Sequence, residues 1–166
     1  MKDGFLINPT SGRLSYTQVI ENILYFIKEE KEAKYTLAIG TDSHAQNSEG
    51  KKRIDFVTAV VIHKVGTGGK YYWQKTSKED IKTLRDKIYT ETTMSLEFAQ
   101  NFVPEVQKIL NSNGTKYEVE IHVDVGEVGK TREMIKEVVG MVIGSGFAVK
   151  TKPYSYGASS IADRHA

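Results

Sequence analysis

Hydrophobic and polar positions along the chain follow two periods, and these periods predict alternating helices and strands. A first amphipathic helix is expected to begin at Ser15 and to end near Glu30, because Ser15 and Gln18 have the spacing of a capping box. Apolar runs bounded by turn residues predict five strands. These strands are expected at residues 35–43, 54–63, 70–75, 117–125 and 147–152.

The longest helical pattern places apolar residues on steps of three and four from Ile81 to Ile109. Pro104 is expected to kink this helix or to end its regular part, because proline lacks the backbone N–H that a helical hydrogen bond requires. A third helix is expected over residues 134–142, and a short fourth helix from about Ala158. Helices therefore both precede and follow the strands.

Turn signals separate these elements. Residues 45–50 are rich in polar side chains and predict a loop after the first strand, whereas the glycines of residues 64–69 predict a hairpin. The resulting order is helix, three strands, helix, strand, helix, strand, helix, with no linker or internal repeat. We therefore expect a single α/β domain over residues 1–166.

Composition narrows the function classes. The 166 residues are 39% hydrophobic and 27% charged, which is typical of a folded globular protein. The lack of cysteine excludes disulfides, thiolate catalysis and cysteine-ligated metal sites. The formal net charge of +2 does not by itself indicate a nucleic-acid partner. With no apolar run of membrane-spanning length and no signal-peptide pattern, we expect a soluble, cytoplasmic protein with no membrane partner.

Glu91 is the first candidate for a functional site, because it occupies a position of the long helical pattern where an apolar residue is expected. A carboxylate on a buried helix face is unfavourable unless a cation or a metal ion pairs with it. The alternative is a slightly rotated helix that leaves Glu91 at its solvent edge.

Two apolar strands each end in an aspartate. Asp42 lies at the end of the first strand, directly after Thr41 and close to Gly40, which leaves room for another element to approach. Asp124 lies at the end of the fourth strand. If the two strands are adjacent and parallel, both carboxylates lie at the rim of the sheet where α/β folds bind ligands. The alternative is that each aspartate only stabilises a turn.

A fourth acid, Asp163, lies on the short terminal helix, where an exposed aspartate on a frayed turn is the alternative interpretation. Together, Asp42, Glu91, Asp124 and Asp163 offer hard oxygen ligands that suit Mg²⁺ or Mn²⁺. Two such ions about 4 Å apart can hold a phosphodiester, activate water and stabilise the leaving oxygen.

Two histidines lie near the aspartates. His44 is two residues after Asp42 and is expected just beyond the strand end, and His122 is two residues before Asp124. In extended backbone each histidine shares a face with its aspartate, and a mixed site would favour Mn²⁺ or Zn²⁺. The alternative is a structural role for each histidine.

Three lysines are candidate phosphate contacts. The segment from Asp124 to Thr131 nearly matches a phosphate-binding loop, but it has Asp124 where that motif requires glycine, so nucleotide hydrolysis by such a loop is not expected. Lys130 is expected at the following helix N-terminus, where it could attract a nucleic-acid phosphate. Lys150 and Lys152 lead from the fifth strand toward the terminal helix.

The order of these elements and acids resembles the ribonuclease H-like fold. The residues of four motifs resemble one particular group with this fold, the bacterial YkuK family of predicted, uncharacterized ribonuclease H-like proteins. The motifs are Ile39-Gly-Thr-Asp-Ser43, His122-Val-Asp-Val-Gly126, Lys150-Thr-Lys-Pro153 and Ala158-Ser-Ser-Ile-Ala-Asp-Arg164. This resemblance implies a central five-stranded mixed sheet flanked by helices, with an extra N-terminal helix. It also implies a carboxylate core of Asp42, Glu91 and Asp124, with Asp163 as a fourth metal ligand.

The function expected from the residues and the resemblance together is a metal-dependent nuclease. It would hydrolyse RNA or DNA phosphodiesters by a two-metal-ion mechanism, with Mg²⁺ or Mn²⁺ as cofactor and nucleic acid as partner. One alternative is a non-catalytic nucleic-acid-binding module of the same fold. Another is a small-phosphoester hydrolase or phosphotransferase that uses the same carboxylates.

Overall fold

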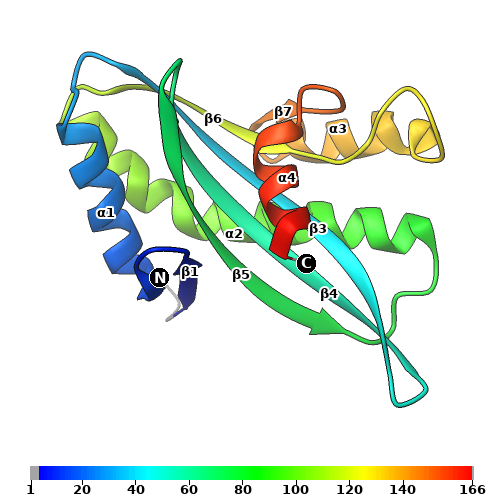
Figure 1. The fold of residues 1–166 in the computed structure, drawn as a ribbon. Coiled ribbons are helices and arrows are strands. Elements are labelled where there is room, and N and C mark those ends of the chain that lie inside the picture. Colours follow the sequence, from blue (N-terminus) through cyan, green and yellow to red (C-terminus); the bar gives the residue numbers. More distant parts are fainter. Residues whose placement is uncertain (1–3, 166) are drawn as a thin grey trace.

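The computed structural model describes residues 4–165, with the exception of the side chains of Ser48, Tyr156, Ser159, Ser160 and Asp163. The strands are β1 (Phe5–Asn8), β2 (Gly12–Ser15), β3 (Lys34–Ser48), β4 (Lys51–Lys64), β5 (Gly68–Lys78), β6 (Lys116–His122) and β7 (Ala148–Lys150). Within residues 4–165 they form one seven-stranded mixed sheet in the order β2-β1-β5-β4-β3-β6-β7 (Figure 1). Only the β3–β6 and β6–β7 pairs are parallel.

Helices cover both faces of this sheet. They are α1 (Tyr16–Lys28), α2 (Leu84–Ser112), α3 (Ile135–Gly144) after a 3₁₀ turn at Arg132–Met134, and α4 (Tyr156–His165). The helices α1, α2 and α3 share one hydrophobic core with one face of the sheet, which we call the α2 face. Helix α4 crosses the opposite face, the α4 face (Figure 1). None of the described helices is long and apolar enough to cross a membrane.

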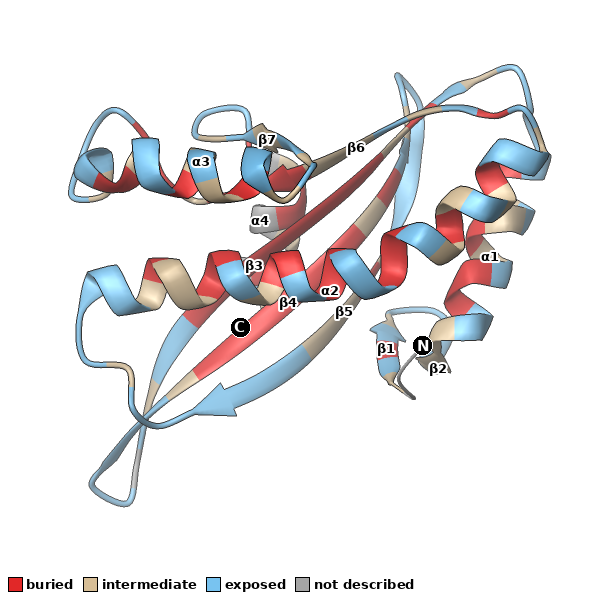
Figure 2. Ribbon diagram, turned by 180° about the vertical axis from the view of Figure 1, so that it is seen from behind, coloured by how far each residue is buried: buried red, intermediate tan, exposed pale blue. Residues whose placement is uncertain are grey.

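The α2 face carries most of the core. Alternate residues of the central strands point toward α2, as Leu37, Ile39 and Val60 do, and all three are fully buried. On α2 the buried positions (red in Figure 2) are turned toward the sheet, and Phe102 and Leu110 are among them. Burial of apolar area on this face is therefore the main stabilising contribution to the fold.

The expected five-stranded sheet is wrong, because the sheet has two additional strands, β1 and β2. They form a hairpin in which the Asn8 side chain accepts hydrogen bonds from the backbone N–H groups of Thr10 and Ser11. The hairpin joins β5 through the pair Ile7 and Trp73. Four-residue strands are too short for a period-two signal, so only the pairing with β5 reveals them.

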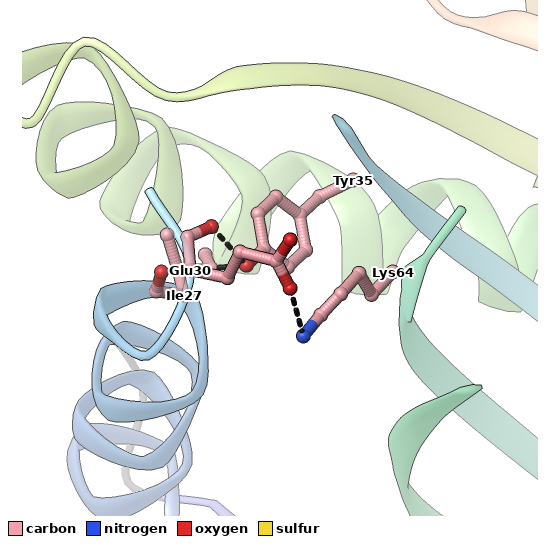
Figure 3. Close-up of polar contacts among 4 residues, drawn as sticks. All are labelled: Ile27, Glu30, Tyr35 and Lys64. Carbon is pink, nitrogen blue, oxygen red and sulfur yellow. Dashed lines mark hydrogen bonds and ion pairs between the residues drawn. The ribbon is translucent and has the colours of Figure 1, made fainter. Parts of the chain in front are cut away.

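Helix α1 begins as the sequence predicts. Ser15 Oγ accepts from the Gln18 N–H at 3.2 Å, and the Gln18 side chain accepts from the Ser15 N–H at 2.8 Å, which completes the capping box. At the other end, the Tyr35 hydroxyl donates to the Glu30 carbonyl at 2.7 Å (Figure 3). The Glu30 carboxylate also pairs with Lys64 Nζ at 2.7 Å. These contacts fix the end of α1 on the sheet.

The predicted loop at residues 45–50 is wrong, because β3 continues to Ser48 and pairs with β4 along its whole length. Antiparallel hydrogen bonds stabilise this ribbon even where its side chains are polar, so the hydrophobic pattern underestimates its length. The turn is confined to Glu49 and Gly50, both with positive φ. The β3–β4 ribbon extends past the other elements (Figure 1).

Of the two outcomes predicted for Pro104, a kink or an end of the regular helix, the second is wrong. Helix α2 continues through Pro104 to Ser112 and therefore does not end at the proline. Residues on both sides of Pro104, including Phe102 and Val106, are buried against the sheet. Their packing holds both parts of the helix in place and compensates for the missing backbone hydrogen bond.

Candidate active site at the end of β6

The site is built where β6 ends beside a strand that continues. The strands β3 and β6 are parallel neighbours, and their last pair is Gly40 with His122. Asp42 follows two residues after Gly40 within β3, and Asp124 follows two residues after the end of β6. Both lie close enough to Glu91 for their charges to raise its pKa. The sequence had left open whether these strands are adjacent, and their pairing brings the two aspartates to one rim.

Asp42 lies on the α4 face. A Cβ atom on Gly40, two residues earlier, would lie 3.1 Å from the Ala158 Cβ atom of α4 and 3.2 Å from the His122 carbonyl oxygen. Glycine is therefore required here because the helix approaches the strand so closely. Asp42 shares this face and is only 8% exposed.

Glu91 approaches the rim from the α2 face. Its Oε1 atom accepts a hydrogen bond from Ser43 Oγ at 2.6 Å, and Ser43 points to the face opposite Asp42. Glu91 is 3% exposed, so the alternative of a solvent-edge position is wrong. Asp42 and Glu91 therefore reach the end of β6 from opposite faces of the sheet.

Two polar contacts set the position of α2 on β3. In addition to the Ser43–Glu91 bond, Thr41 Oγ1 lies 2.7 Å from Ser95 Oγ and 2.9 Å from Thr58 Oγ1. Two strand residues span about 6.6 Å and four helix residues about 6 Å, so both contacts form at once. Thr41 and Ser43 are not among the predicted site residues. Their alternation with Asp42 along the strand is the signal in the sequence that they point to the opposite face, toward α2.

The electrostatics of Glu91 reflect its burial and its neighbours. The pKa of Glu91 is raised to about 8, mainly by burial and also by the negative charges of Asp42 and Asp124. The Ser43 hydrogen bond and the nearby Lys87 oppose this rise. The two aspartates are therefore close enough to Glu91 to influence its protonation, and the three carboxylates form one electrostatic group.

Asp124 has a cationic partner. Its Oδ1 atom lies 3.0 Å from the Nζ atom of Lys152, one of the three lysines expected to contact phosphate. Asp163 belongs to α4, but its side chain lies outside the described residues. The structure thus brings three of the four predicted acids to one rim and provides no position for the fourth carboxylate.

The donor set fits a divalent cation in its chemistry. Three carboxylates supply hard oxygen atoms, and the pKa of Glu91 is raised mainly by its burial and in smaller part by the charges of Asp42 and Asp124. Among the described side chains, however, no three His, Asp or Glu residues are grouped so that they could hold a metal ion. Ser43 and Lys152 engage one oxygen atom of Glu91 and one of Asp124, respectively, and the second oxygen of each carboxylate carries neither contact.

The two histidines differ in their surroundings. The Nδ1 atom of His122 accepts from the Ala158 N–H at 3.2 Å, and its Nε2 atom lies 2.8 Å from Glu120 Oε1. Both ring nitrogens of His122 are thus engaged, and this residue links β6 to α4. His44 is exposed and lies within β3, so its expected position beyond the strand end is wrong.

The other two predicted phosphate contacts are exposed. Lys150 ends β7 and pairs in register with His122, which places it near the rim. Lys130 does not lie at the N-terminus of α3, because the 3₁₀ turn at Arg132–Met134 separates the two. Of the three lysines, Lys152 is the one with an ion pair to a site carboxylate.

The last described residue of α4 contacts β5. His165 stacks on Trp73, with ring centroids 4.4 Å apart and an interplanar angle of 11°. Burial and the nearby Arg164 and Lys75 lower the pKa of His165. The helix is therefore held at both ends, by His122 near its start and by Trp73 near its finish.

Comparison with known proteins agrees with this architecture. A family model described as ribonuclease H-like matches residues 18–166. The chain belongs to the ribonuclease H-like family. Within it, the chain is 31% identical over 176 residues to "Uncharacterized protein YkuK" of Bacillus subtilis (strain 168), which covers 99% of this chain and 98% of the relative. No solved structure matches the chain.

These matches confirm the resemblance to YkuK that the motifs around Asp42 and Asp124 predicted. The five expected strands correspond to β3, β4, β5, β6 and β7 of this chain. The strands β1 and β2 extend the sheet beyond β5. Family membership points to a nuclease type of role in general, and the relative's own function is uncharacterized.

Proposed function

We propose that this protein is a metal-dependent nuclease that hydrolyses RNA or DNA phosphodiesters. The observation that carries the proposal is the arrangement of acids near the end of β6. Glu91 is buried and bonded to Ser43, and burial together with the nearby charges of Asp42 and Asp124 raises its pKa to about 8. Acids whose pKa is perturbed by burial and by neighbouring charges are concentrated at functional sites. Membership in the ribonuclease H-like family supports the same reaction class.

In this proposal Asp42 and Asp124 hold Mg²⁺ or Mn²⁺, Glu91 completes the site and Asp163 is a fourth ligand. Two ions are expected, and when bound they would supply an activated water and stabilise the charge on the leaving oxygen. Ser43 positions the Glu91 carboxylate through its 2.6 Å hydrogen bond. Lys152 balances the charge of Asp124 and, being exposed, is free to turn toward a substrate phosphate.

The test is cleavage by purified protein with Mg²⁺ or Mn²⁺ on RNA, DNA and hybrid substrates of the same sequence. We expect Asp42→Asn to abolish cleavage, because it removes a ligand charge without changing the side-chain shape. Asp80→Asn is the matched control, since Asp80 is exposed and lies outside the site. Cleavage that Asp42→Asn leaves intact would indicate a contaminating nuclease and refute the proposal.

The second candidate function is a nucleic-acid-binding module without turnover. One observation favours it: Asp124 is already paired with Lys152, so part of the carboxylate charge is neutralised within the chain. Metal titration by calorimetry separates the two candidates. The nuclease should bind two divalent ions, and Asp42→Asn should weaken that binding. The module should bind none and should show affinity for nucleic acid that falls steeply with salt.

A further inference from the structure

The α4 face of the sheet continues past the carboxylate site as an exposed polar surface. In the β3–β4–β5 register, Asp42, Val57 and Lys75 form one row, and the next row is His44, Asp55 and Ser77. Gln46 and Arg53 follow as the next pair. We call His44, Gln46, Arg53, Lys75 and Ser77, with Asp55 at their centre, the polar strip.

Among the side chains that the structure describes, those of helix α4 leave the rows beyond the first one open. Ala158 approaches Gly40, and Ala162 packs with Val57 of the first row and with Ala59. Consistent with this, His44, Arg53, Lys75 and Ser77 are all exposed. The strip therefore starts beside Asp42, at the edge of α4, and runs out along the protruding ribbon.

Asp55 organises the positive charges of the strip. Its side chain is 6% exposed and accepts a hydrogen bond from Ser77 Oγ at 2.5 Å. Its two oxygens lie 3.5 Å from Arg53 Nε and 4.0 Å from Lys75 Nζ. The two cationic side chains are 47% and 39% exposed, so one buried anion holds two accessible cations in place. Cations held in this way lose less conformational entropy when they bind an anion.

We propose that the polar strip binds the sugar–phosphate backbone of one nucleic-acid strand as the strand leaves the carboxylate site. That the strand comes from the carboxylate site rests on the proposed function. That the polar strip binds a nucleic-acid strand does not. Arg53 and Lys75 contact phosphate oxygens, and Ser77 and Gln46 provide neutral hydrogen-bonding groups beside them.

The length of the ribbon sets the size of the bound segment. From Asp42 to Gln46 the strand β3 extends about 13 Å, the length of about four stacked nucleotides. Affinity for single-stranded oligonucleotides should therefore rise with length over this range and change little beyond it. A ribbon that only stabilises the sheet would produce no such dependence.

The first experiment measures fluorescence anisotropy of labelled 12-nucleotide RNA and DNA single strands in EDTA, so that no cleavage occurs. Arg53→Ala combined with Lys75→Ala should weaken binding at least 10-fold and reduce the slope of log affinity against log salt by about two. The matched control is Lys31→Ala with Lys136→Ala, which removes the same charge from exposed positions on other elements. Equal losses in both double variants would overturn the proposal.

The second experiment tests the role of Asp55. Asp55→Asn makes the protein more positive, so general electrostatic attraction would tighten binding. The polar strip predicts weaker binding, because Arg53 and Lys75 lose the anion that holds them. Ser77→Ala, which changes no charge, should weaken binding by a smaller factor and keeps the test decisive if Asp55→Asn unfolds the protein. Tighter binding by a folded Asp55→Asn variant, or unchanged binding by Ser77→Ala, would refute this role.

These outcomes are independent of the nuclease test. A protein that binds single strands through Arg53 and Lys75 but never cleaves them would refute the nuclease and leave the strip in place. If the protein cleaves nucleic acid but the two double variants have equal affinities for single strands, the nuclease is supported and the polar strip is refuted. Polyglutamate serves as a competitor of similar charge density, and competition as effective as that of unlabelled RNA would indicate an acidic protein partner and overturn the proposal.

Discussion

The two faces of the sheet differ in what they contribute. The α2 face packs large side chains such as Phe102, Leu110 and Ile39 into one extensive core. The α4 face has a small cluster of Val57, Ala59 and Ala162, with Trp73 and Ile161 at its margin. The difference indicates that the α2 face provides most of the stability, and that the α4 face is left to present polar groups.

Polar groups on the two faces also have different partners. On the α2 face, Glu91 and Ser95 bond to hydroxyls of β3 and are sealed from water. On the α4 face, Asp55 and Asp124 pair with exposed cationic side chains. Buried, satisfied contacts hold α2 in register, whereas cations at the surface remain available to a ligand. The candidate site lies at the end of β6, where both kinds of contact meet.

The largest expected effect comes from breaking the α2 face. Phe102→Ala removes a fully buried ring and should lower the free energy of unfolding by about 3 to 5 kcal/mol. Ile161→Ala, in the smaller cluster, should cost less than half as much because Ile161 is only partly buried. Denaturant unfolding measures both values. Equal costs would contradict the proposed division between the faces.

The second prediction concerns the buried carboxylate. An unfolded Glu91 loses its proton near pH 4.5 and the folded residue near pH 8, so between these values the folded state binds the extra proton. Stability therefore falls as pH rises through this window, and Glu91→Gln should remove the loss. In EDTA at pH 8 the variant should be more stable than the wild type by about 4 kcal/mol, and at pH 5 by about 1 kcal/mol.

Thermal and denaturant unfolding at pH 5 and pH 8 measure this difference. Glu97→Gln, at an exposed position of the same helix, is the control and should show no such pH dependence. A Glu91→Gln variant that is less stable than the wild type at pH 8 would show that the carboxylate is stabilised as an anion.

The third prediction breaks the α4 face. Gly40→Ala places a methyl group 3.1 Å from Ala158 Cβ and 3.2 Å from the His122 carbonyl oxygen, which should cost about 2 kcal/mol. Hydrogen exchange should become faster in α4 and stay unchanged in α2. Gly140→Ala is the control, since its added methyl group meets no neighbour and alanine favours a helix. Faster exchange in both helices would mean that the faces are not independent.

The smallest effect is expected at the end of α1, remote from the site. Tyr35→Phe removes the hydroxyl that donates to the Glu30 carbonyl and should cost about 1 kcal/mol in unfolding free energy. Affinity for single-stranded RNA should not change. A loss of RNA affinity would show that the α2 face acts directly in binding.

Sequence reasoning succeeded where the signal is local. The capping box of Ser15 and Gln18 and the glycine turn between β4 and β5 each depend on residues within a few positions of one another. The predicted position of Asp42 at a strand end is wrong, because β3 continues to Ser48, whereas Asp124 follows two residues after the end of β6. The sequence did not reveal β1 and β2, whose short strands depend on pairing with β5.

The sequence by itself determined the kinds and the order of the elements from α1 onward, and the set of acids that could act. Only the tertiary structure decided that Asp42 and Glu91 approach the end of β6 from opposite faces, that Ser43 holds Glu91 and that Lys152 pairs with Asp124. Helical and strand periods arise from neighbouring residues, whereas strand register and helix docking depend on contacts between distant segments. For that reason the sequence could name the acids of the site but could not predict their partners.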